Sequence, residues 1–290
     1  MRGMYPVVIA AEPDELKFFL RDFKLEKEVV KGFTRMFFGE FRGRKLGLAC
    51  LGVGKVNAAA GTALVSYEMQ PDILFMVGAS GAISPEVVPG DIVVGSGIID
   101  RDVGFLTGHG LIPGGAWLYE RLKPYDPYLV REITTDPNLL ELAQAVAKEA
   151  EPKLESFGER KAKIHFGAIS TGEKFIASLS EKERLYKNYQ VLAAEMEGSG
   201  FAQTAYALDL PFLVIRGISD HADDSLDIKE PVVYPDTKAL IALLSGKEAL
   251  NPNSDPLLRA CDAAKTLHSV FQKAAYNASL MAFSIIQRLP

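Results

Sequence analysis

The sequence has few of the residues that build disulfide frameworks and metal centres. Only 2 of its 290 residues are cysteines, Cys50 and Cys261, and two cysteines are too few for a disulfide framework. The 4 histidines are scattered, and no Cys-x-x-Cys or His-x-x-x-His pair occurs along the chain. These absences indicate reduced thiols and give no support to a metal site, so we predict neither a metal nor another cofactor.

The sequence also lacks an excess of positive charge and long hydrophobic runs. Its 32 lysines and arginines against 37 acidic residues give a net charge of -5, so no basic surface for nucleic acid is indicated. No apolar stretch reaches the roughly 20 residues of a membrane span, and the first residues contain no apolar core of a signal peptide. We therefore expect a cytoplasmic protein with no nucleic-acid or membrane partner.

What the sequence does contain is a regular alternation of short apolar runs and helix-like segments. Continuous apolar runs of strand length are typical of strands that are covered on both faces of a parallel sheet. We expect strands at 5–11, 73–77, 92–94, 165–169 and 212–215, helices at 58–67, 139–150, 201–208 and 257–289, and a hairpin over 34–51. This pattern predicts one α/β domain over residues 1–290, with a twisted, mostly parallel mixed central sheet flanked by helices.

Two segments depart from this alternation. Residues 100–137 are rich in glycine, proline and aromatic side chains, and a loop of this length is usually functional or lies at a subunit contact. A structured surface excursion is the alternative for this segment. Residues 226–256 contain several prolines, asparagines and aspartates, and we expect a second excursion there, with one short helix near 238–244.

Polar residues that follow buried segments indicate a pocket. Glu195-Met196-Glu197 precedes a helix start of small residues, and Arg216-Gly217-Ile218-Ser219-Asp220 ends an apolar strand. Ligands bind at the carboxyl ends of strands in a parallel α/β sheet, so Glu197 and Asp220 are predicted to share one pocket. Two structural roles are the alternatives: Asp220 as the N-cap of a helix, and Glu197 as the partner of Arg216 in a buried ion pair.

Three other strand ends carry glycine or small polar residues. The turn at 52–57 precedes an alanine-rich helix, yet it lacks the third glycine of a dinucleotide fingerprint and the Ser or Thr of a phosphate loop. In Gly78-Ala79-Ser80-Gly81, Ser80 weakly resembles a nucleophile elbow, but no histidine has a convincing partner role. The segment 170–176 follows a third strand and includes Phe175. The glycines of the first turn favour a close approach of the backbone to another group.

In their order and spacing, these stretches resemble the nucleoside phosphorylase and nucleosidase superfamily, and most closely its methylthioadenosine/S-adenosylhomocysteine nucleosidases. The matching stretches are 9–16, 52–60, 77–83 with 89–94, 170–176 and 195–223. The Glu-Met-Glu and Arg-x-Ile-Ser-Asp motifs at this separation are the most specific part of the resemblance. It implies a nucleoside phosphorylase-like fold, a purine nucleoside as substrate, cleavage of its N-glycosidic bond, and a homodimer or higher homo-oligomer.

The resemblance also assigns roles to individual residues. Asp220 matches the general acid that contacts N7 and the exocyclic amine of adenine, and Glu197 matches the carboxylate that binds the ribose hydroxyls. Glu15 matches the carboxylate that orients the attacking water, with Glu12 as a nearby rival. The other implied substrate-binding residues are Met196 under the ribose, Phe175 stacked on the purine, Ile176 at the base edge through its backbone, and Glu195, Ser219, Ala79 and Val53.

The chemistry of the reaction agrees with these roles. Cleavage passes through an oxocarbenium-like state, in which positive charge grows on the sugar and negative charge grows on the departing purine. A carboxylate near the ribose stabilises the first charge, and a protonated acid at N7 neutralises the second. Asp220 then has to hold its proton far above the ordinary aspartate pKa of about 3.9, so we expect burial to raise its pKa.

The same resemblance bears on the nucleophile. Related phosphorylases place an arginine where Met76 stands and a Ser or Thr hydroxyl where Ala79 stands, and both groups bind phosphate. Their replacement favours water, and hence a nucleosidase, with a phosphorylase as the alternative. Nucleosidases usually carry serine at the Ala79 position, so this residue is a departure. A non-catalytic nucleoside-binding protein of the same fold is a third hypothesis.

The 5′ substituent of the nucleoside is left open by the sequence. A thioether would need apolar surroundings such as Val53 and the Phe105–Tyr128 segment. A 5′-phosphate would need cations, and Arg101, Arg121 and Lys123 lie in that region. An AMP-like or futalosine-like substrate is therefore an alternative to a thioether nucleoside.

Overall fold

A computed structural model describes residues 4–108, 110–120, 123–157, 159–226 and 255–290; at 110, 113, 120, 123–126, 226 and 255–269 this description covers the backbone. In chain order the strands are β1 (Pro6–Ala10), β2 (Phe23–Lys31), β3 (Thr34–Phe41), β4 (Arg44–Cys50), β5 (Ile73–Ala82), β6 (Ile92–Asp100), β7 (Gly104–Thr107), β8 (Gly110–Pro113), β9 (Ala116–Glu120), β10 (Lys123–Val130), β11 (Ile133–Thr134), β12 (Ile164–Thr171), β13 (Ala193–Glu195) and β14 (Phe212–Asp220). The helices are α1 (Lys17–Leu20), α2 (Lys55–Met69), α3 (Pro137–Ala150), α4 (Leu179–Tyr189), α5 (Gly198–Ala207) and α7 (Asp255–Ile286), with 3-10 turns η1 (Pro13–Leu16), η2 (Glu151–Lys153) and η3 (Asp224–Leu226).

Ten strands form one mixed sheet in the order β11-β6-β12-β13-β5-β1-β4-β3-β2, and β14 pairs with both β5 and β6. Its central pairs are mostly parallel, while β2, β3 and β4 form an antiparallel meander at one edge. Because β14 joins β5 to β6, the path from β5 through β13 and β12 to β6 closes into a ring of strands. The predicted α/β fold with a mostly parallel mixed sheet is confirmed.

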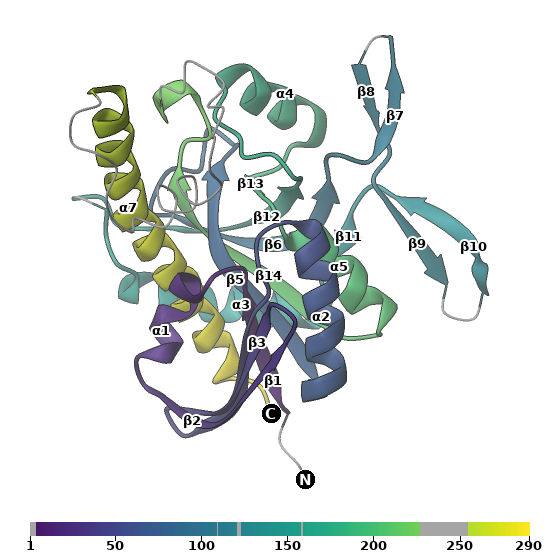
Figure 1. Ribbon diagram of the computed structural model, residues 1–290, viewed down its shortest axis with the longest axis vertical. Coiled ribbons are helices and arrows are strands. Elements are labelled where there is room, and N and C mark those ends of the chain that lie inside the picture. The colour runs from purple at the N-terminus through teal and green to yellow at the C-terminus, as the bar shows by residue number, and fades with distance from the viewer. Residues whose placement is uncertain (1–3, 109, 121–122, 158, 227–254) are drawn as a thin grey trace.

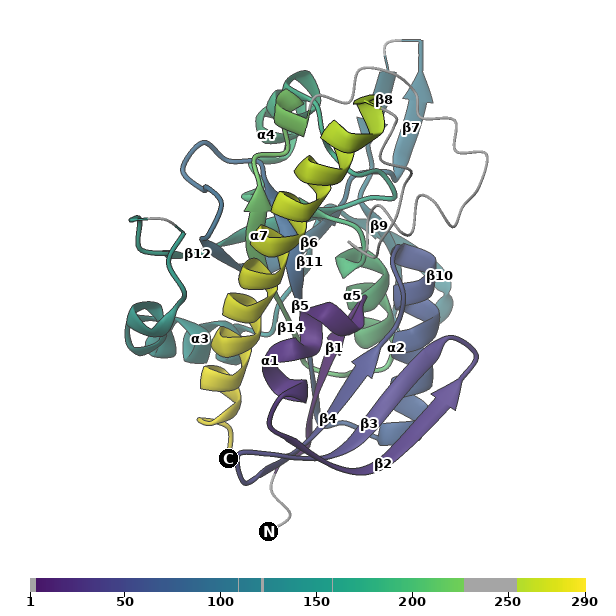
Figure 2. The ribbon, with the colours of Figure 1, turned by 60° about the vertical axis from the view of Figure 1, so that its left-hand side comes forward.

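Both faces of this sheet are buried under helices. Along β1, Val7 and Ile9 pack in the same cluster as residues of α2 and α5, whereas Val8 and Ala10 pack with residues of α3 and α7. The ribbon shows the same arrangement, with α2 and α5 on one side of the sheet and α7 on the other (Figures 1 and 2). Continuous apolar strands follow from this double burial. Within the described ranges, no helix combines the length and the apolar character that spanning a membrane requires.

Most of the predicted elements are present with shifted ends. The strand predicted at 73–77 continues to Ala82 and the one predicted at 212–215 continues to Asp220, so the polar residues belong to the strands themselves. The final helix begins at Asp255 and ends at Ile286. Strand β2, helix α4 and the short strand β13 are among the elements that have no counterpart in the prediction. Strand β2 lies at the sheet edge with most of its residues exposed, so its sequence carries no continuous apolar run.

The described residues between 100 and 137 form a structured excursion, which was the alternative to a long loop. They build two antiparallel hairpins, β7–β8 and β9–β10, which project away from the body of the molecule (Figure 1), and β11 returns to pair with β6. Phe105, Leu106 and Trp117 are exposed on these hairpins. The excursion predicted at 226–256, with its short helix near 238–244, lies almost entirely outside the described residues.

Gly217 on β14 lies directly against the backbone of α7. A Cβ built at this position overlaps the carbonyl oxygen of Ala274, a helix atom that cannot move by itself. We expect Gly217→Ala to lower the free energy of unfolding by about 1–3 kcal/mol, the range for overpacking a close-packed interior, as measured by urea denaturation. Gly108→Ala is the control, because a Cβ there meets nothing within 4 Å. Equal losses in the two variants would contradict this packing argument.

Candidate active site

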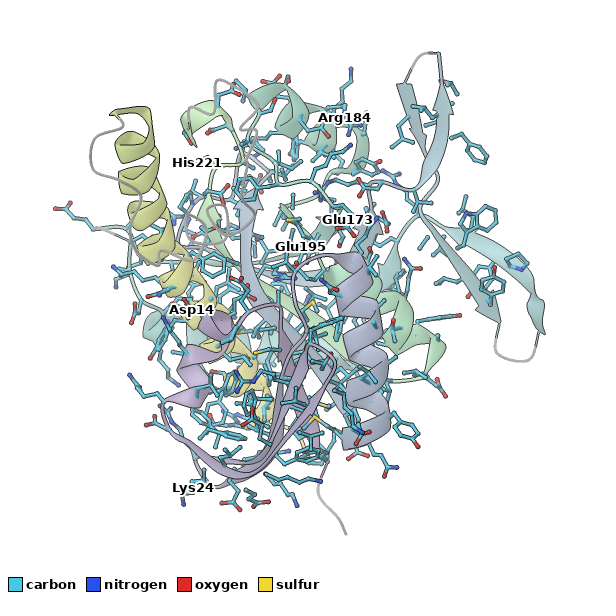
Figure 3. All side chains as sticks on the ribbon, viewed as in Figure 1. Asp14, Lys24, Glu173, Arg184, Glu195 and His221 are labelled. Atoms are coloured by element: carbon cyan, nitrogen blue, oxygen red, sulfur yellow. The ribbon has the colours of Figure 1, made fainter. Side chains whose placement is uncertain are left out.

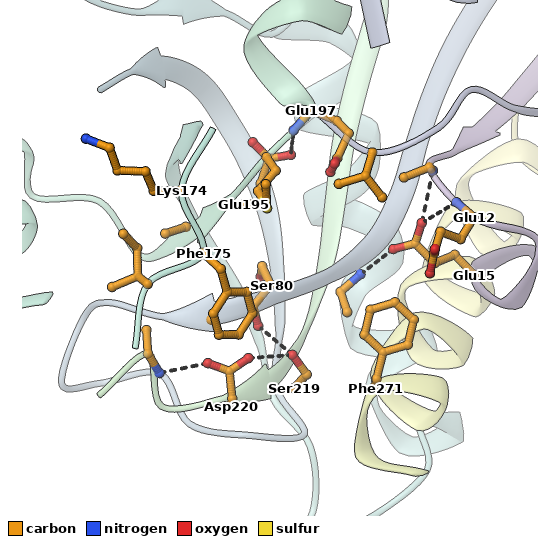
Figure 4. Close-up of a pocket in the computed structure, with 18 of the residues that line it drawn as sticks. Glu12, Glu15, Ser80, Lys174, Phe175, Glu195, Glu197, Ser219, Asp220 and Phe271 are labelled. Carbon is orange, nitrogen blue, oxygen red and sulfur yellow. Dashed lines mark hydrogen bonds between the residues drawn. The ribbon is translucent and has the colours of Figure 1, made fainter. Parts of the chain in front are cut away.

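One pocket opens where the ends of β5, β13 and β14 meet the segments that follow β1, β4 and β12 (Figure 4). The residues that the sequence assigns to catalysis or substrate binding all line it, although they come from separate segments of the chain. They are Glu15, Val53, Ala79, Phe175, Ile176, Glu195, Met196, Glu197, Ser219 and Asp220. The structure therefore brings the whole predicted set together.

Arg216 is the buried centre of a charge network beside this pocket. Its side chain is 1% exposed, and its Nη2 donates to Glu195 and, at 3.1 Å, to Glu197. Its Nη1 lies 3.9 Å from Oε1 of Glu15. If all three carboxylates were ionised, the cluster would carry an uncompensated negative charge in a buried place, so protonation of a carboxyl is favoured. Glu197 therefore both pairs with Arg216, as the alternative predicted, and lines the pocket.

Glu197 follows β13 at the start of α5, and its two oxygens have different partners. Oε1 accepts from the backbone N–H of Gly54 at 2.9 Å, and Oε2 accepts from Arg216. Burial raises the pKa of Glu197 to about 7, with Arg216 opposing the rise and Glu195 adding to it. Glu195 itself accepts from the amides of Glu197 and Gly198 at 3.0 and 2.8 Å, so its carboxylate holds the local chain in place.

Glu15 is fixed by backbone donors from the segment after β1 and from β5. Its Oε2 accepts from the N–H groups of Ala11 and Glu12 at 2.9 and 3.1 Å, and its Oε1 accepts from Ala79 at 3.0 Å. Burial raises the pKa of Glu15, and Arg216 and the backbone bonds oppose that rise. The rival Glu12 also lines the pocket but is exposed. Glu15 is therefore the carboxyl group that the fold holds at a defined position.

Asp220 is the last residue of β14 and is 8% exposed. Its Oδ1 accepts from the N–H of Ala222 at 2.8 Å, and its Oδ2 accepts from the hydroxyl of Ser219 at 2.8 Å. Burial raises the pKa of Asp220, and these two hydrogen bonds oppose the rise. The Asp220 side chain thus bonds the backbone two residues further along the chain, as in an Asx turn. The next helical turn, η3, begins only at Asp224, so the alternative of Asp220 as a helix N-cap is wrong.

The glycine turn before α2 brings the start of this helix to the pocket. Gly52 and Gly54 have φ of +91° and +96°, values that favour glycine, and Gly54 donates to Glu197. The N–H of Lys55 donates to Oε1 of Glu173 at 2.9 Å. Glu173 and Glu195 are labelled near this end of α2 in Figure 3. The close backbone approach that the glycines predict is therefore made to carboxylates of the chain itself, which the positive end of a helix dipole stabilises.

Arg101 holds the loop that presents Phe175 and Ile176. Arg101 is 3% exposed, and its guanidinium donates to backbone carbonyl oxygens of β12, of β13 and of the loop that follows β12. These carbonyls are those of Ser170 and Glu195 at 3.1 Å, Gly172 at 3.2 Å and Lys174 at 2.5 Å. Phe175 stands at the rim with 55% of its surface exposed, while Ile176 is buried. Arg101 thus positions a wall of the pocket.

Three cations, Arg101, Arg121 and Lys123, were considered as partners of a 5′-phosphate. Both terminal nitrogens of Arg101 are engaged by carbonyl oxygens, which disfavours that role for Arg101. Arg121 lies outside the described residues, and the side chain of Lys123 is likewise outside them. Val53, the apolar candidate, lines the pocket.

Several residues of the pocket and of its charge network escape sequence reasoning. Arg216 contacts Glu15 and Glu195 in addition to Glu197, the one partner that the sequence suggested. The sequence signal for this cluster is an arginine at the end of an apolar strand, because a buried cation requires buried partners. Phe271 reaches the pocket from α7, far beyond the last matching motif, and no local pattern announces it. Ser80 lines the pocket although its role as a nucleophile is discounted.

Comparison with known families decides the assignment. The family described as the Phosphorylase superfamily matches residues 6–239. The chain belongs to the phosphorylase superfamily. A 5′-methylthioadenosine/S-adenosylhomocysteine nucleosidase from Desulfotalea psychrophila is 33% identical to this chain over 214 residues. The match covers 73% of this chain and 82% of that relative.

Solved structures agree with this membership. A nucleosidase of the same name from Neisseria meningitidis, in complex with methylthio-immucillin-A, matches with a TM-score of 0.71 at 25% identity, covering 99% of this chain and 100% of that one. A futalosine hydrolase from Helicobacter pylori matches with a TM-score of 0.70 over 99% of this chain and 98% of that one, but at 19% identity this likeness shows the fold alone. The resemblance drawn from the sequence motifs is confirmed.

The raised pKa of Glu197 predicts a pH dependence of stability. The unfolded chain releases this proton near the ordinary glutamate pKa of about 4.3, whereas the folded chain holds it to about pH 7. Between these values the folded state binds more protons, so the contribution of Glu197 to the free energy of unfolding falls as the pH rises. Glu197→Gln mimics the protonated form. Its stability relative to the wild type should therefore rise from about pH 5 to about pH 8 in urea denaturation.

The control for this experiment is Glu26→Gln on the exposed face of β2. The difference in free energy of unfolding between that variant and the wild type should not show the same rise with pH. A constant or falling difference for Glu197→Gln over the same range would contradict the raised pKa.

Proposed function

We propose that this chain hydrolyses the N-glycosidic bond of a purine nucleoside. The observation that carries the proposal is the position of two buried carboxyl groups on opposite sides of one pocket, Asp220 on one side and Glu15 on the other (Figure 4). Such a pair suits an acid that protonates a leaving base and a carboxylate that orients water. Membership of the phosphorylase superfamily supports this reaction class.

In the proposed reaction, Asp220 gives its proton to N7 of the purine while the bond between base and ribose breaks. Burial raises the pKa of Asp220, which supports a protonated acid at higher pH than an ordinary aspartate allows. As the base leaves, positive charge grows on the ribose, and Glu197 bound to the ribose hydroxyls stabilises it. A water oriented by Glu15 adds to the anomeric carbon and passes its proton to that carboxylate.

The remaining site residues support binding in this proposal. Phe175 stacks on the purine, the backbone of Ile176 bonds the edge of the base, and Met196 packs under the ribose. Arg101 supports the first two contacts, because it fixes the carbonyl oxygens of the loop that carries them. The free base and the ribose leave as separate products.

Water is favoured over phosphate by the surroundings of Glu15. The N–H of Ala79, which offers no hydroxyl, donates to Glu15, and the sulfur of Met76 accepts from Nη2 of Arg216 at 3.4 Å. Arg216 is already shared by three carboxylates. A phosphate dianion at this place would face carboxylates without an arginine of its own, at a large desolvation cost.

The substrate that we propose is a nucleoside with a neutral or zwitterionic thioether at the 5′ carbon, such as 5′-methylthioadenosine or S-adenosylhomocysteine. The names of the relatives from Desulfotalea psychrophila and Neisseria meningitidis support this choice. The charge of the pocket supports it too, since carboxylates dominate its lining and disfavour a 5′-phosphate. These carboxylates are Glu12, Glu15, Glu195, Glu197 and Asp220, against the cations Arg101 and Lys174.

We also propose that the chain forms a homodimer. The two hairpins that project from the sheet carry exposed apolar side chains, which a contact between copies would bury. They include Phe105, Leu106, Trp117 and Tyr119.

Incubation with single nucleosides tests the reaction and the substrate together. The purified protein is mixed with methylthioadenosine, adenosylhomocysteine, adenosine, inosine, AMP or futalosine, with and without phosphate, and the products are separated by chromatography. We expect free adenine and a thioribose from the first two at equal rates in both buffers. Formation of ribose 1-phosphate products that requires phosphate would indicate a phosphorylase. Binding without any product would indicate a nucleoside-binding protein.

Substitution of the two carboxyl groups tests the mechanism. Asp220→Asn removes the transferable proton and Glu197→Gln removes the negative charge beside the ribose, so each should lower kcat by about 10²- to 10⁴-fold. Circular dichroism should show an unchanged fold in both. Asp22→Asn, an exposed residue outside the pocket, is the control and should keep the wild-type rate. Near-wild-type turnover in either pocket variant would remove the proposed mechanism.

A further inference from the structure

Asp102 is a partly buried carboxylate that the proposed mechanism leaves unused. It follows β6, its side chain is 27% exposed, and it does not line the pocket. Its Oδ2 accepts from the backbone N–H of Glu173 at 2.7 Å and lies 3.2 Å from Nζ of Lys55. Asp102 thus bonds the chain two residues before Phe175, the aromatic side chain at the rim of the pocket.

Residues 172–176, the Phe175 loop, lie directly against Asp102 and Arg101. A Cβ built at Gly172 would lie 2.8 Å from both Oδ1 of Asp102 and Cζ of Arg101, so a side chain there would push the loop away from these two residues. Arg101 donates to carbonyl oxygens of the loop, whereas Asp102 accepts from one of its N–H groups. Because they bond opposite kinds of backbone group, the two side chains together fix both the position and the orientation of the loop.

Lys55 holds the Asp102 carboxylate in this place. The Lys55 side chain is 18% exposed, and its Nζ donates to Asp100 at 3.1 Å in addition to its contact with Asp102. The Asp100 side chain is 3% exposed and also accepts from the hydroxyl of Ser199 at 2.8 Å. Ion pairs that are shielded from solvent and share several hydrogen bonds are stronger than exposed surface pairs. Asp102 is therefore anchored to the end of β6 and to the starts of α2 and α5.

The start of α2 also serves the other side of the pocket. The N–H of Gly54 donates to Glu197 at 2.9 Å, and the N–H of the next residue, Lys55, donates to the carboxylate of Glu173 at 2.9 Å. Figure 3 shows Glu173 near this end of α2. One turn of the chain therefore bonds both Glu197 and the Phe175 loop, and the contact of Lys55 with Asp102 is a second connection between them.

We propose that Asp102 is a positioning residue, which together with Lys55 holds the Phe175 loop in the conformation that binds the base. This proposal rests on the proposed function for the identity of the ligand as a purine. A loop that is ordered before the ligand arrives loses less conformational entropy on binding, so Asp102 contributes to affinity without touching the ligand.

The test compares Asp102→Ala with the wild type by the binding of adenine, measured by calorimetry, and by the rate of trypsin cleavage after Lys174. The variant removes the acceptor of the Glu173 N–H, while Lys55 keeps Asp100 as a partner. We expect the dissociation constant of adenine to rise about tenfold, because binding then has to order the loop. Lys174 is exposed on the loop, so a less ordered loop should be cut faster, and mass spectrometry can quantify the fragment that ends at Lys174.

Two further variants of Asp102 test the hydrogen bond itself. The side-chain oxygen of Asp102→Asn can still accept from Glu173, so its adenine affinity and cleavage rate should lie closer to the wild type than those of Asp102→Ala. If Asp102→Ala failed to fold, Asp102→Ser, whose shorter side chain leaves the Glu173 N–H without its acceptor, should change both measurements in the same direction.

Arg160→Ala is the control for lost stability. It breaks the pair with the buried Asp91 just before the start of β6, at the opposite end of this strand from Asp102, and Arg160 does not line the pocket. This variant should lower the melting temperature but keep the wild-type affinity for adenine and the wild-type rate of cleavage after Lys174. A merely structural role of Asp102 would give the same pattern as this control.

The outcomes separate this proposal from the proposed function. An unchanged dissociation constant of adenine or an unchanged rate of cleavage in Asp102→Ala would overturn the role of Asp102, as would the absence of adenine binding by the wild type. Weaker adenine binding and faster cleavage in Asp102→Ala, in a protein that releases no base from any nucleoside, would support the positioning role and defeat the hydrolysis.

Discussion

The pocket depends on one buried cation and the three carboxyl groups that surround it. Arg216 projects from β14 to the side chains of Glu15, Glu195 and Glu197, which belong to segments far apart in the sequence. Breaking even one buried pair of this kind typically costs about 3–5 kcal/mol, because a charge is then left without compensation. The guanidinium therefore fixes the relative positions of η1, β13 and β14, and with them both sides of the pocket.

Glycine makes this cluster possible. A Cβ at Gly78 would overlap the Arg216 guanidinium and the carboxylate of Glu15, so only glycine lets β5 pass beside the ion pair. At the start of α2, a Cβ at Gly54 would crowd the carboxylate of Glu173, and the N–H of Gly54 donates to Glu197. The glycine-rich turn at 52–57, which was compared with phosphate-binding loops, thus brings the backbone to carboxylates. Phosphate-binding loops and this carboxylate cluster share the glycine pattern, because both need backbone N–H groups close to an anion.

The fold and part of the candidate site could be predicted from local patterns in the sequence, and the resemblance to a family supplied the other candidate residues. Apolar runs locate the central strands, and the polar residues at their ends locate Glu197 and Asp220 in one place. Contacts between distant segments could not be predicted in the same way. The third partner of Arg216, the arrival of Phe271 from α7 and the contact of Asp102 with the Phe175 loop are properties of packing in three dimensions.

Irregular composition also limits prediction, as the hairpins over residues 104–130 illustrate. All four residues of β7 are exposed, because its hairpin projects from the sheet, whereas in β9 the buried Ala116 and Leu118 alternate with the exposed Trp117 and Tyr119. Hydrophobic periodicity reports burial against a core, so it carries little information about a strand that has none. Strand β2 at the sheet edge escapes for the same reason.

The two sides of the pocket differ in what opposes the effect of burial on their carboxyl groups. Burial raises the pKa of both Asp220 and Glu15, but the main opposition at Glu15 is the charge of Arg216, whereas at Asp220 it is the hydroxyl of Ser219. A cation favours an ionised carboxylate, and the Arg216 guanidinium lies 3.9 Å from Glu15. This difference agrees with the roles that we propose, an acid on the side of Phe175 and a carboxylate on the side of Arg216.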